Sequence, residues 1–208
     1  MNDPEASSRL PLSPDEEFVH GHLPLSRIFP ADASEIPLEI EFGTGKGLFL
    51  IESGRRHPDR RFLGVERSLS YYRIARDRIA RAALPRVRVI RADGAEVVDL
   101  LPDGATAAFH AYFLDPWPKK KQRKRRLLGP RFLATAGVKA GAGALFRIVT
   151  DHAEYAGAIG ASIDEAIAAG AAWKTLPWEA APAPPPTHYE LKYRAAGRAL
   201  HRFLLVKG

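Results

Sequence analysis

Residues 38–50 read LEIEFGTGKGLFL, and this stretch decides the fold class. It begins with an apolar run, passes through glycines and ends in a second apolar run, which is the pattern of a strand, a tight loop and a helix. The glycines Gly43, Gly45 and Gly47 have the spacing G-x-G-x-G, which differs from the dinucleotide-binding spacing G-x-G-x-x-G. A strand that feeds a glycine loop and a helix is typical of a Rossmann-like α/β domain.

The same alternation of apolar runs and amphipathic stretches continues along the chain. After residues 38–42, buried parallel strands are expected at residues 62–65, 87–90, 107–114 and 144–149. Helices are expected at about residues 46–57, 69–83, 94–101, 129–137 and 151–169. Strands and helices in this order predict a doubly wound, mostly parallel sheet.

The alternation breaks near the C-terminus. Residues 173–178 are expected to form one strand, and the proline-rich loop EAAPAPPP follows it. Residues 189–194 and 200–206 are predicted to pair as an antiparallel hairpin around the turn AAGR. Successive βα units that end in an antiparallel hairpin have the layout of a Rossmann-like class I methyltransferase.

The composition bounds the kind of protein. Its 208 residues suit one domain, and 31 Lys and Arg against 24 Asp and Glu give a net charge of +7, which favours a polyanionic partner. The chain has no cysteine, so disulfides and thiolate metal sites are excluded, and no metal is expected. No apolar run is long enough for a membrane span, and a cytoplasmic protein is expected.

The first 36 residues differ from the rest. They are rich in proline, serine and charge, and they have no apolar segment of the secretory-signal kind. We expect a flexible N-terminal arm at residues 1–36, with one short helix, and a methyltransferase domain at residues 37–208. The sequence leaves open whether the protein is a monomer or a homodimer.

Acidic residues end three successive predicted strands. Glu41 lies two residues before Gly43, where a carboxylate repels phosphate but suits the ammonium and sulfonium groups of S-adenosylmethionine. Glu66 ends the next strand, at the place where an acidic side chain accepts ribose hydroxyls. Asp93 ends the third and is placed for the adenine side, although it is also a plausible helix cap. Together with Gly43 and Gly45, these carboxylates predict a site for S-adenosylmethionine and disfavour NAD.

The fourth strand runs into the loop Asp115-Pro116-Trp117-Pro118. In this fold the site lies beyond the carboxyl ends of the strands, so Asp115 is expected to point at the substrate. The prolines are expected to hold Asp115 and Trp117 in an extended conformation, with the indole available for base stacking or for covering the core. A basic run follows directly and predicts RNA-backbone contacts by Lys119, Lys120, Lys121, Arg123, Lys124, Arg125 and Arg126.

Two further groups belong to the predicted site. Asp151 follows the fifth strand at the same edge of the sheet. The motif Thr187-His188-Tyr189-Glu190 follows the proline-rich loop, and Thr187 and Glu190 are candidates for hydrogen bonds to the edge of a base, with Glu190 accepting from guanine.

With these residues in view, residues 38–206 resemble the bacterial tRNA (guanine-N7-)-methyltransferase family. The most specific element is DPWPKK at 115–120 followed by KRRL at 124–127. The family's E-x-G-x-G-x-G, GVE, T-D and T-x-Y-E motifs match residues 41–47, 64–66, 150–151 and 187–190. The sequence departs from the family at Leu114, where proline is usual, and at Gln122, where the family commonly has histidine.

The resemblance implies a role for each matching residue. Glu41, Glu66 and Asp93 would bind the methyl donor, and Asp115 would lie beside the methyl group as the catalytic residue. Binding of tRNA would fall to Lys119, Asp151, Thr187, Tyr189 and Glu190, with a guanosine of the variable loop as target.

Two other functions stay open. One is a methyltransferase for a different base atom, such as the amino nitrogen of adenine, because DPW resembles the loop of those enzymes. The other is a non-catalytic RNA-binding module. Guanine N7 carries an in-plane lone pair, so its methylation needs alignment and charge stabilisation and no strong general base.

Overall fold

The computed structural model describes residues 23–29 and 35–208, so most of the predicted arm lies outside the described residues. The described part of the arm packs on the domain. It holds the short helix α2 (Leu25–Ile28), and Leu23, Ile28 and Phe29 are buried in the main core. The Leu23 N–H donates to the Leu100 carbonyl at 2.9 Å. The domain boundary at residue 37 stays a prediction.

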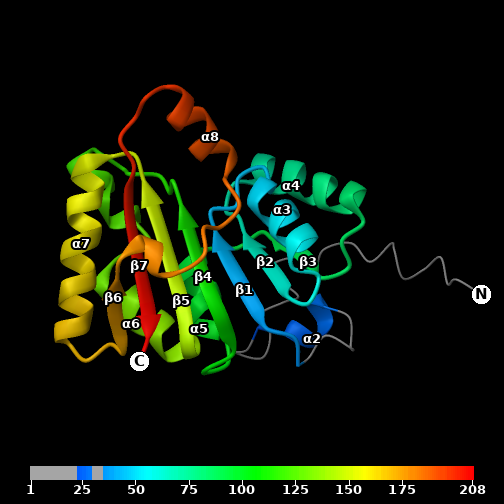
Figure 1. Cartoon of the computed structure of the whole chain (residues 1–208), viewed down its shortest axis with the longest axis horizontal. Coiled ribbons are helices and arrows are strands. Elements are labelled where there is room, and N and C mark those ends of the chain that lie inside the picture. Colours follow the sequence, from blue (N-terminus) through cyan, green and yellow to red (C-terminus); the bar gives the residue numbers. More distant parts are fainter. Residues whose placement is uncertain (1–22, 30–34) are drawn as a thin grey trace, which may run out of the picture.

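The described chain forms one sheet of seven strands, shown in Figure 1. The strands are β1 (Leu38–Phe42), β2 (Arg61–Val65), β3 (Val87–Ile90), β4 (Thr106–Tyr112), β5 (Ala140–Thr150), β6 (Trp173–Leu176) and β7 (His201–Lys207). Their order is β3-β2-β1-β4-β5-β7-β6, in which the first five lie parallel and β7 runs antiparallel to both β5 and β6. The predicted doubly wound, mostly parallel sheet with antiparallel strands at its C-terminal end is confirmed, but the antiparallel strands are not those of the predicted hairpin.

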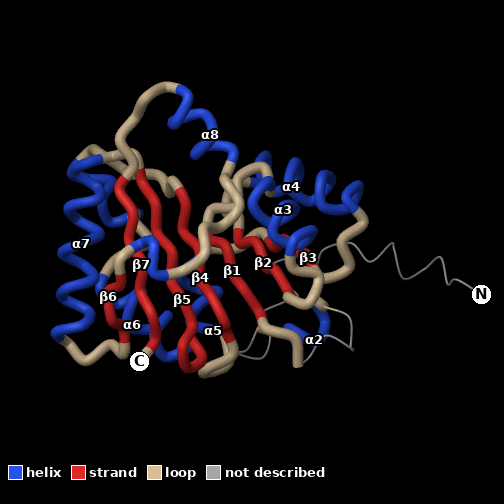
Figure 2. Tube along the Cα trace, viewed as in Figure 1, coloured by secondary structure: helices blue, strands red, loops and turns tan. Residues whose placement is uncertain are grey.

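Helices cover both faces of the sheet (Figure 2). One face carries α3 (Leu48–Arg56) and α4 (Leu69–Ala82), and the other carries α5 (Gly94–Leu100), α6 (Pro130–Lys139) and α7 (Ala153–Ala168). The segment between β6 and the helix α8 (His188–Ala195) crosses in front of β5 and β4. No helix of the described residues is both long enough and apolar enough to span a bilayer.

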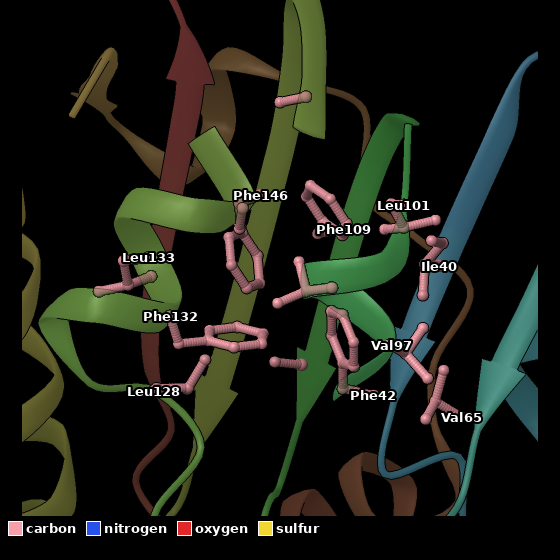
Figure 3. Close-up of a cluster of buried hydrophobic side chains, with 14 of the residues drawn as sticks. Ile40, Phe42, Val65, Val97, Leu101, Phe109, Leu128, Phe132, Leu133 and Phe146 are labelled. Carbon is pink, nitrogen blue, oxygen red and sulfur yellow. The ribbon is translucent and has the colours of Figure 1, made fainter. Parts of the chain in front are cut away.

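Aromatic and aliphatic side chains from both layers fill the main core (Figure 3). Phe42 of β1 stacks on Phe109 of β4 with ring centroids 5.9 Å apart, and its edge meets Phe132 of α6 at 5.2 Å. Such ring pairs add about 0.5–1.5 kcal/mol each beyond the area they bury. This packing fixes β1 and β4 side by side, and so places the loops that follow them next to each other.

One predicted element is wrong. Residues 189–194 form the helix α8 and are not a strand of a hairpin. The Thr187 hydroxyl accepts from the Glu190 N–H at 3.0 Å, and Glu190 pairs with Arg194 one turn later. The spacing T-x-x-E is the start of a capping box, a helix signal that outweighs the alternation read as a strand. The antiparallel partners of β7 are therefore β5 and β6.

Candidate active site

The glycine loop joins β1 to α3 and bends through left-handed backbone. Gly43, Gly45 and Gly47 have φ of 69°, 56° and 74°, a region that residues with a Cβ rarely adopt. A Cβ at Gly43 would also lie 2.4 Å from the side chain of Leu114, in the loop after β4. Glycine is therefore required at Gly43 for two reasons, backbone conformation and close approach.

The side chain of Glu41 is buried in the domain, next to the glycine loop. It is only 3% exposed, and its carboxyl accepts from the Thr44 hydroxyl at 2.8 Å. Burial raises the pKa of Glu41 to about 8, opposed by the Thr44 hydrogen bond and reinforced by the charge of Glu66. A buried carboxylate facing a pocket becomes favourable when a cation enters beside it, because the cation replaces the lost hydration.

Glu66 ties the glycine loop to the end of β2. Its Oε2 accepts from the Gly45 N–H and its Oε1 from the Ser68 N–H, both at 2.8 Å. Burial raises the pKa of Glu66, while these backbone hydrogen bonds lower it. A carboxylate with two oxygens has lone pairs left for further donors, so the side chain can still accept from ribose hydroxyls.

Asp93 caps a helix, which is the alternative role that the sequence allowed. It is the N-cap of α5 and accepts from the Ala95 N–H at 2.9 Å, and it lies 3.7 Å from Arg67. It is partly exposed at the end of β3, beside the end of β2 that carries Glu66. Its capping bond uses one oxygen, and its binding role stays a prediction.

A pocket of about 220 Å³ opens between the glycine loop and α8. Glu41, Gly43, Thr187 and Tyr189 all line it, so residues that are about 145 positions apart in the sequence meet there. Helix α8 lies beyond the carboxyl ends of the parallel strands (Figure 1), and a Cβ at Gly45 would be 3.9 Å from the Tyr189 ring. The structure thus brings together two of the predicted donor-binding residues and two of the predicted substrate-binding residues. The other predicted site residues do not line this pocket: Gly45, Glu66, Asp93, Asp115, Lys119, Asp151 and Glu190.

Sequence reasoning missed part of this lining. Thr44, Lys46, Tyr71, Tyr112 and Lys192 also face the pocket. A hydrogen bond with Tyr71 and burial raise the pKa of Tyr189 to about 12. Thr44 and Lys46 lie in the glycine-loop motif that the sequence singled out, and only that position offered a signal for them.

Asp115 is exposed on the loop after β4, between two residues with strained backbone. Phe113 has φ of 55° and Trp117 has φ of 42°. The expected extended conformation of Trp117 is therefore wrong, although a residue before proline normally avoids helical backbone. Such strain costs about 1–3 kcal/mol per residue and persists only where the surroundings hold it. The negative charge of Asp115 acts on Glu66, one of the predicted donor-binding residues: like burial, it raises the pKa of Glu66.

Arg126 holds the strained loop in place. Its Nε donates to the Pro116 carbonyl at 2.8 Å, its guanidinium pairs with Glu154 of α7, and it lies 4.8 Å above the Tyr155 ring. Arg125 stacks on Trp117 at 4.6 Å. The predicted stacking face of Trp117 is thus occupied by an arginine in this structure.

The basic run forms a short 3-10 helix, η3 (Lys120–Arg125), and its members differ in what they contact. Arg123 and Arg126 both pair with Glu154. The lysines of the basic run, by contrast, are exposed and make no ion pair with the described residues: Lys119, Lys120, Lys121 and Lys124. The positive charge that has no ion-pair partner among the described residues therefore lies mostly on these lysines, which follow Asp115 in the chain.

Two remaining predicted residues, Asp151 and Glu190, form ion pairs in or near α8. Asp151, after β5, pairs with Arg198 at 2.6 Å. Glu190 is buried, and Arg194 and Arg202 both contact its Oε1, at 2.5 and 3.4 Å. Both contacts use Oε1, and the role of Glu190 toward a base stays a prediction. The ring of Phe113 packs against Tyr193 at 5.3 Å and anchors α8 above the strained loop.

The sheet order, the carboxylate-lined glycine loop and the loop after β4 define a Rossmann-like methyltransferase domain. A family described as "Putative methyltransferase" matches residues 35–203. The chain belongs to this family. No group of three or more histidine, aspartate or glutamate side chains suited to a metal gathers among the described residues.

Curated relatives carry the name tRNA (guanine-N(7)-)-methyltransferase. Those from Levilactobacillus brevis, Geobacillus thermodenitrificans and Alkalilimnicola ehrlichii are 41%, 35% and 38% identical over 49%, 64% and 64% of this chain. The aligned segments cover 47%, 62% and 56% of those relatives, so the chain spans about half or somewhat more of their length. The sequence resemblance to this group is confirmed.

Solved structures share the fold at low identity. The aminoglycoside resistance methyltransferase NpmB1 superposes with a TM-score of 0.58 at 14% identity, covering 86% of this chain and 91% of that one. A precorrin-6y C5,15-methyltransferase from Geobacter metallireducens gives 0.55 at 14% identity, covering 82% and 78%. These likenesses establish the class I methyltransferase architecture.

Proposed function

We propose that this protein transfers a methyl group from S-adenosylmethionine to N7 of a guanine in tRNA, in the variable loop. The observation that carries the proposal is the pocket in which Glu41 and Gly43 meet Thr187 and Tyr189. The exposed lysines that follow Asp115 in the chain add positive charge for RNA. The names of the curated relatives support the choice of tRNA and of N7. A tRNA substrate also makes the cytoplasm the expected location.

The residues around the glycine loop fit the donor. The glycines leave the space that a Cβ would fill, and Glu41 and Glu66 supply negative charge for a cation and acceptors for ribose hydroxyls. Asp93 is next along the strand ends, at the expected adenine side. When bound, the donor supplies an electrophilic methyl group. Binding of the cation favours the ionised form of Glu41, because the positive charge compensates the burial of the carboxylate.

Asp115 is the residue we assign to the chemical step. Positive charge develops on guanine as N7 is methylated, and a carboxylate held beside it stabilises that charge. The strained loop and the bond from Arg126 to Pro116 fix Asp115 in advance, so little reorganisation is needed. Thr187, Tyr189 and the Oε2 of Glu190 are assigned to the base edge, Asp151 to its surroundings, and the lysines of the basic run to phosphates.

The test is transfer of labelled methyl from S-adenosylmethionine to unmodified tRNA, with the product nucleoside identified by mass spectrometry. We expect 7-methylguanosine from the wild type and a large loss with Asp115→Asn. The matched control is Asp77→Asn, which removes an exposed aspartate of α4 that pairs only with the neighbouring Arg76. A different methylated nucleoside would move the function to another base, and donor binding without any transfer would favour the RNA-binding module.

A further inference from the structure

A second cavity lies away from the glycine loop, on the face of the sheet that α3 and α4 cover. It measures about 440 Å³ and is bounded by the first half of β4 and β5, the C-terminal part of α3 and the proline-rich segment between β6 and α8. Figure 1 shows this segment passing in front of the sheet, beside α3. A volume of this size accommodates a small organic molecule. Among the residues that the structure describes, Phe49 is the one whose side chain lines both cavities.

The floor of the cavity is a polar chain that is already satisfied. The His110 ring lies 2.8 Å from Glu39 through Nε2 and 2.9 Å from the Tyr112 hydroxyl through Nδ1, and Arg60 also donates to Glu39. Burial lowers the pKa of His110, so the ring is neutral and its Nε2–H donates to the carboxylate. Glu39 and His110 therefore offer no spare donor to a ligand.

The rim is positively charged. Arg56, Arg60 and Arg147 line the cavity together with His57, against the single carboxylate of Glu39. One guanidinium is committed to Glu39, and Arg147 uses one nitrogen for the Pro182 carbonyl at 3.1 Å. Each guanidinium has five N–H donors in a fixed fork, so donors remain for an anion.

A buried hydroxyl without a partner lies in the same cavity. Ser53 of α3 is 1% exposed, and its Oγ makes no hydrogen bond in the described structure. Buried polar groups are nearly always paired, and an unpaired one destabilises the fold. An acceptor oxygen of a ligand would satisfy this hydroxyl. Since no partner for Ser53 exists within the site, this feature points to a ligand and not merely to a solvated basic surface.

The other walls are apolar. Two aromatic rings, Phe49 and Phe62, and three prolines, Pro182, Pro184 and Pro185, also line the cavity. A planar or apolar body packs well between aromatic rings and prolines, while its charged end meets the arginines. The net positive rim suits a dianion better than a single negative charge.

We propose that this cavity binds a phosphate monoester carried on a small planar or apolar body, at a site separate from the glycine-loop pocket. Ser53 and Arg147 contact the phosphate, Arg56 provides the outer positive charge, and the rings and prolines hold the body. The proposal does not depend on the methyl acceptor, because no residue assigned to the acceptor lines this cavity.

The probe is phenyl phosphate, titrated by calorimetry in the presence of saturating S-adenosylmethionine, with phenol and inorganic phosphate as partial ligands. We expect saturable binding of phenyl phosphate, at least tenfold tighter than either partial ligand. Arg147→Gln should weaken it at least tenfold. The matched control is Arg55→Gln on the same helix, because Arg55 pairs with Glu52 and does not line the cavity, and this variant should bind like the wild type.

Ser53→Ala distinguishes a ligand-binding role of Ser53 from a purely structural one. It removes the unpaired hydroxyl, so thermal stability should be unchanged or higher, while phenyl phosphate binding weakens severalfold. The proposal is overturned if phenyl phosphate does not saturate, if Arg55→Gln weakens it as much as Arg147→Gln, or if Ser53→Ala leaves its affinity unchanged.

Discussion

Replacing Glu41 by glutamine should make the folded protein more stable at alkaline pH. The buried carboxyl has its pKa raised from 4.5 to about 8, so the folded state holds a proton that the unfolded chain has lost between these values. Stability from this group is complete below pH 4.5 and is lost as the pH rises through 8. Above pH 8 the cost of ionised Glu41 is at most about 5 kcal/mol. Glutamine avoids this cost and still accepts the hydrogen bond from Thr44.

The assay is urea unfolding of both proteins from pH 5 to 9 without ligand. We expect the stability of Glu41→Gln relative to the wild type to grow across this range and to level off above pH 8. Calorimetry of S-adenosylmethionine binding near pH 7, in buffers with different ionisation enthalpies, should show proton release by the wild type that is reduced in the variant. Parallel stability curves for the two proteins would refute the reasoning, since Glu41 would then have an ordinary pKa.

Three further changes test other parts of the structure. Gly43→Ala should reduce donor affinity at least tenfold in calorimetry, whereas Gly104→Ala, with φ of 70° but open space around it, should cost about 1–2 kcal/mol of stability and leave donor affinity unchanged. Arg126→Ala should lower kcat for tRNA with donor affinity preserved; a change confined to the salt dependence of tRNA binding would make it a phosphate contact instead. His110→Phe should destabilise the fold by about 1–3 kcal/mol in urea, because Glu39 loses a buried hydrogen-bond donor while Arg60 still pairs with it. Burial raises the pKa of Glu39, but the hydrogen bonds from His110 and Arg60 outweigh it and lower this pKa to about 2. The wild type should therefore lose stability as the pH falls from 4.5 to 2, and the variant should lose less.

The first half of the fold was predictable because its signals are local. Each strand from β1 to β4 is a short apolar run, and each is followed by turn residues and an amphipathic helix, so periodicity located all of them to within about two residues. The glycine loop was recognisable for the same reason, since three left-handed positions in five residues leave glycine as the only unstrained choice.

The C-terminal part was harder because its signals compete. The residues of α8 alternate in polarity like a strand, yet Thr187 caps them as a helix and Glu190 pairs one turn along. Periodicity over eight residues cannot separate the two, and the capping motif was interpreted only as a substrate-binding motif. The helix is also held from outside, through Phe113 and Arg202, which no local pattern reveals.

The basic run shows the same limit in its side chains. Its positive charge is evident in the sequence, but the contact that each basic side chain makes is not. Arg126 supports the loop before it, Arg125 covers Trp117, and the lysines stay exposed. The difference depends on Glu154, which lies on another helix about thirty residues later.

The sequence by itself determined the α/β fold class, the order of the elements as far as β6, and the family, because each depends on residues that are close in the chain or on a motif as a whole. Only the tertiary structure decided which residues share a pocket, how the loop around Asp115 is held, and that Glu41 is buried enough to change its pKa. It also revealed the second cavity, which draws on five separate parts of the chain. Distances between remote residues follow from sheet order and helix packing, and burial follows from everything that surrounds a residue, so neither is written in a local stretch of sequence.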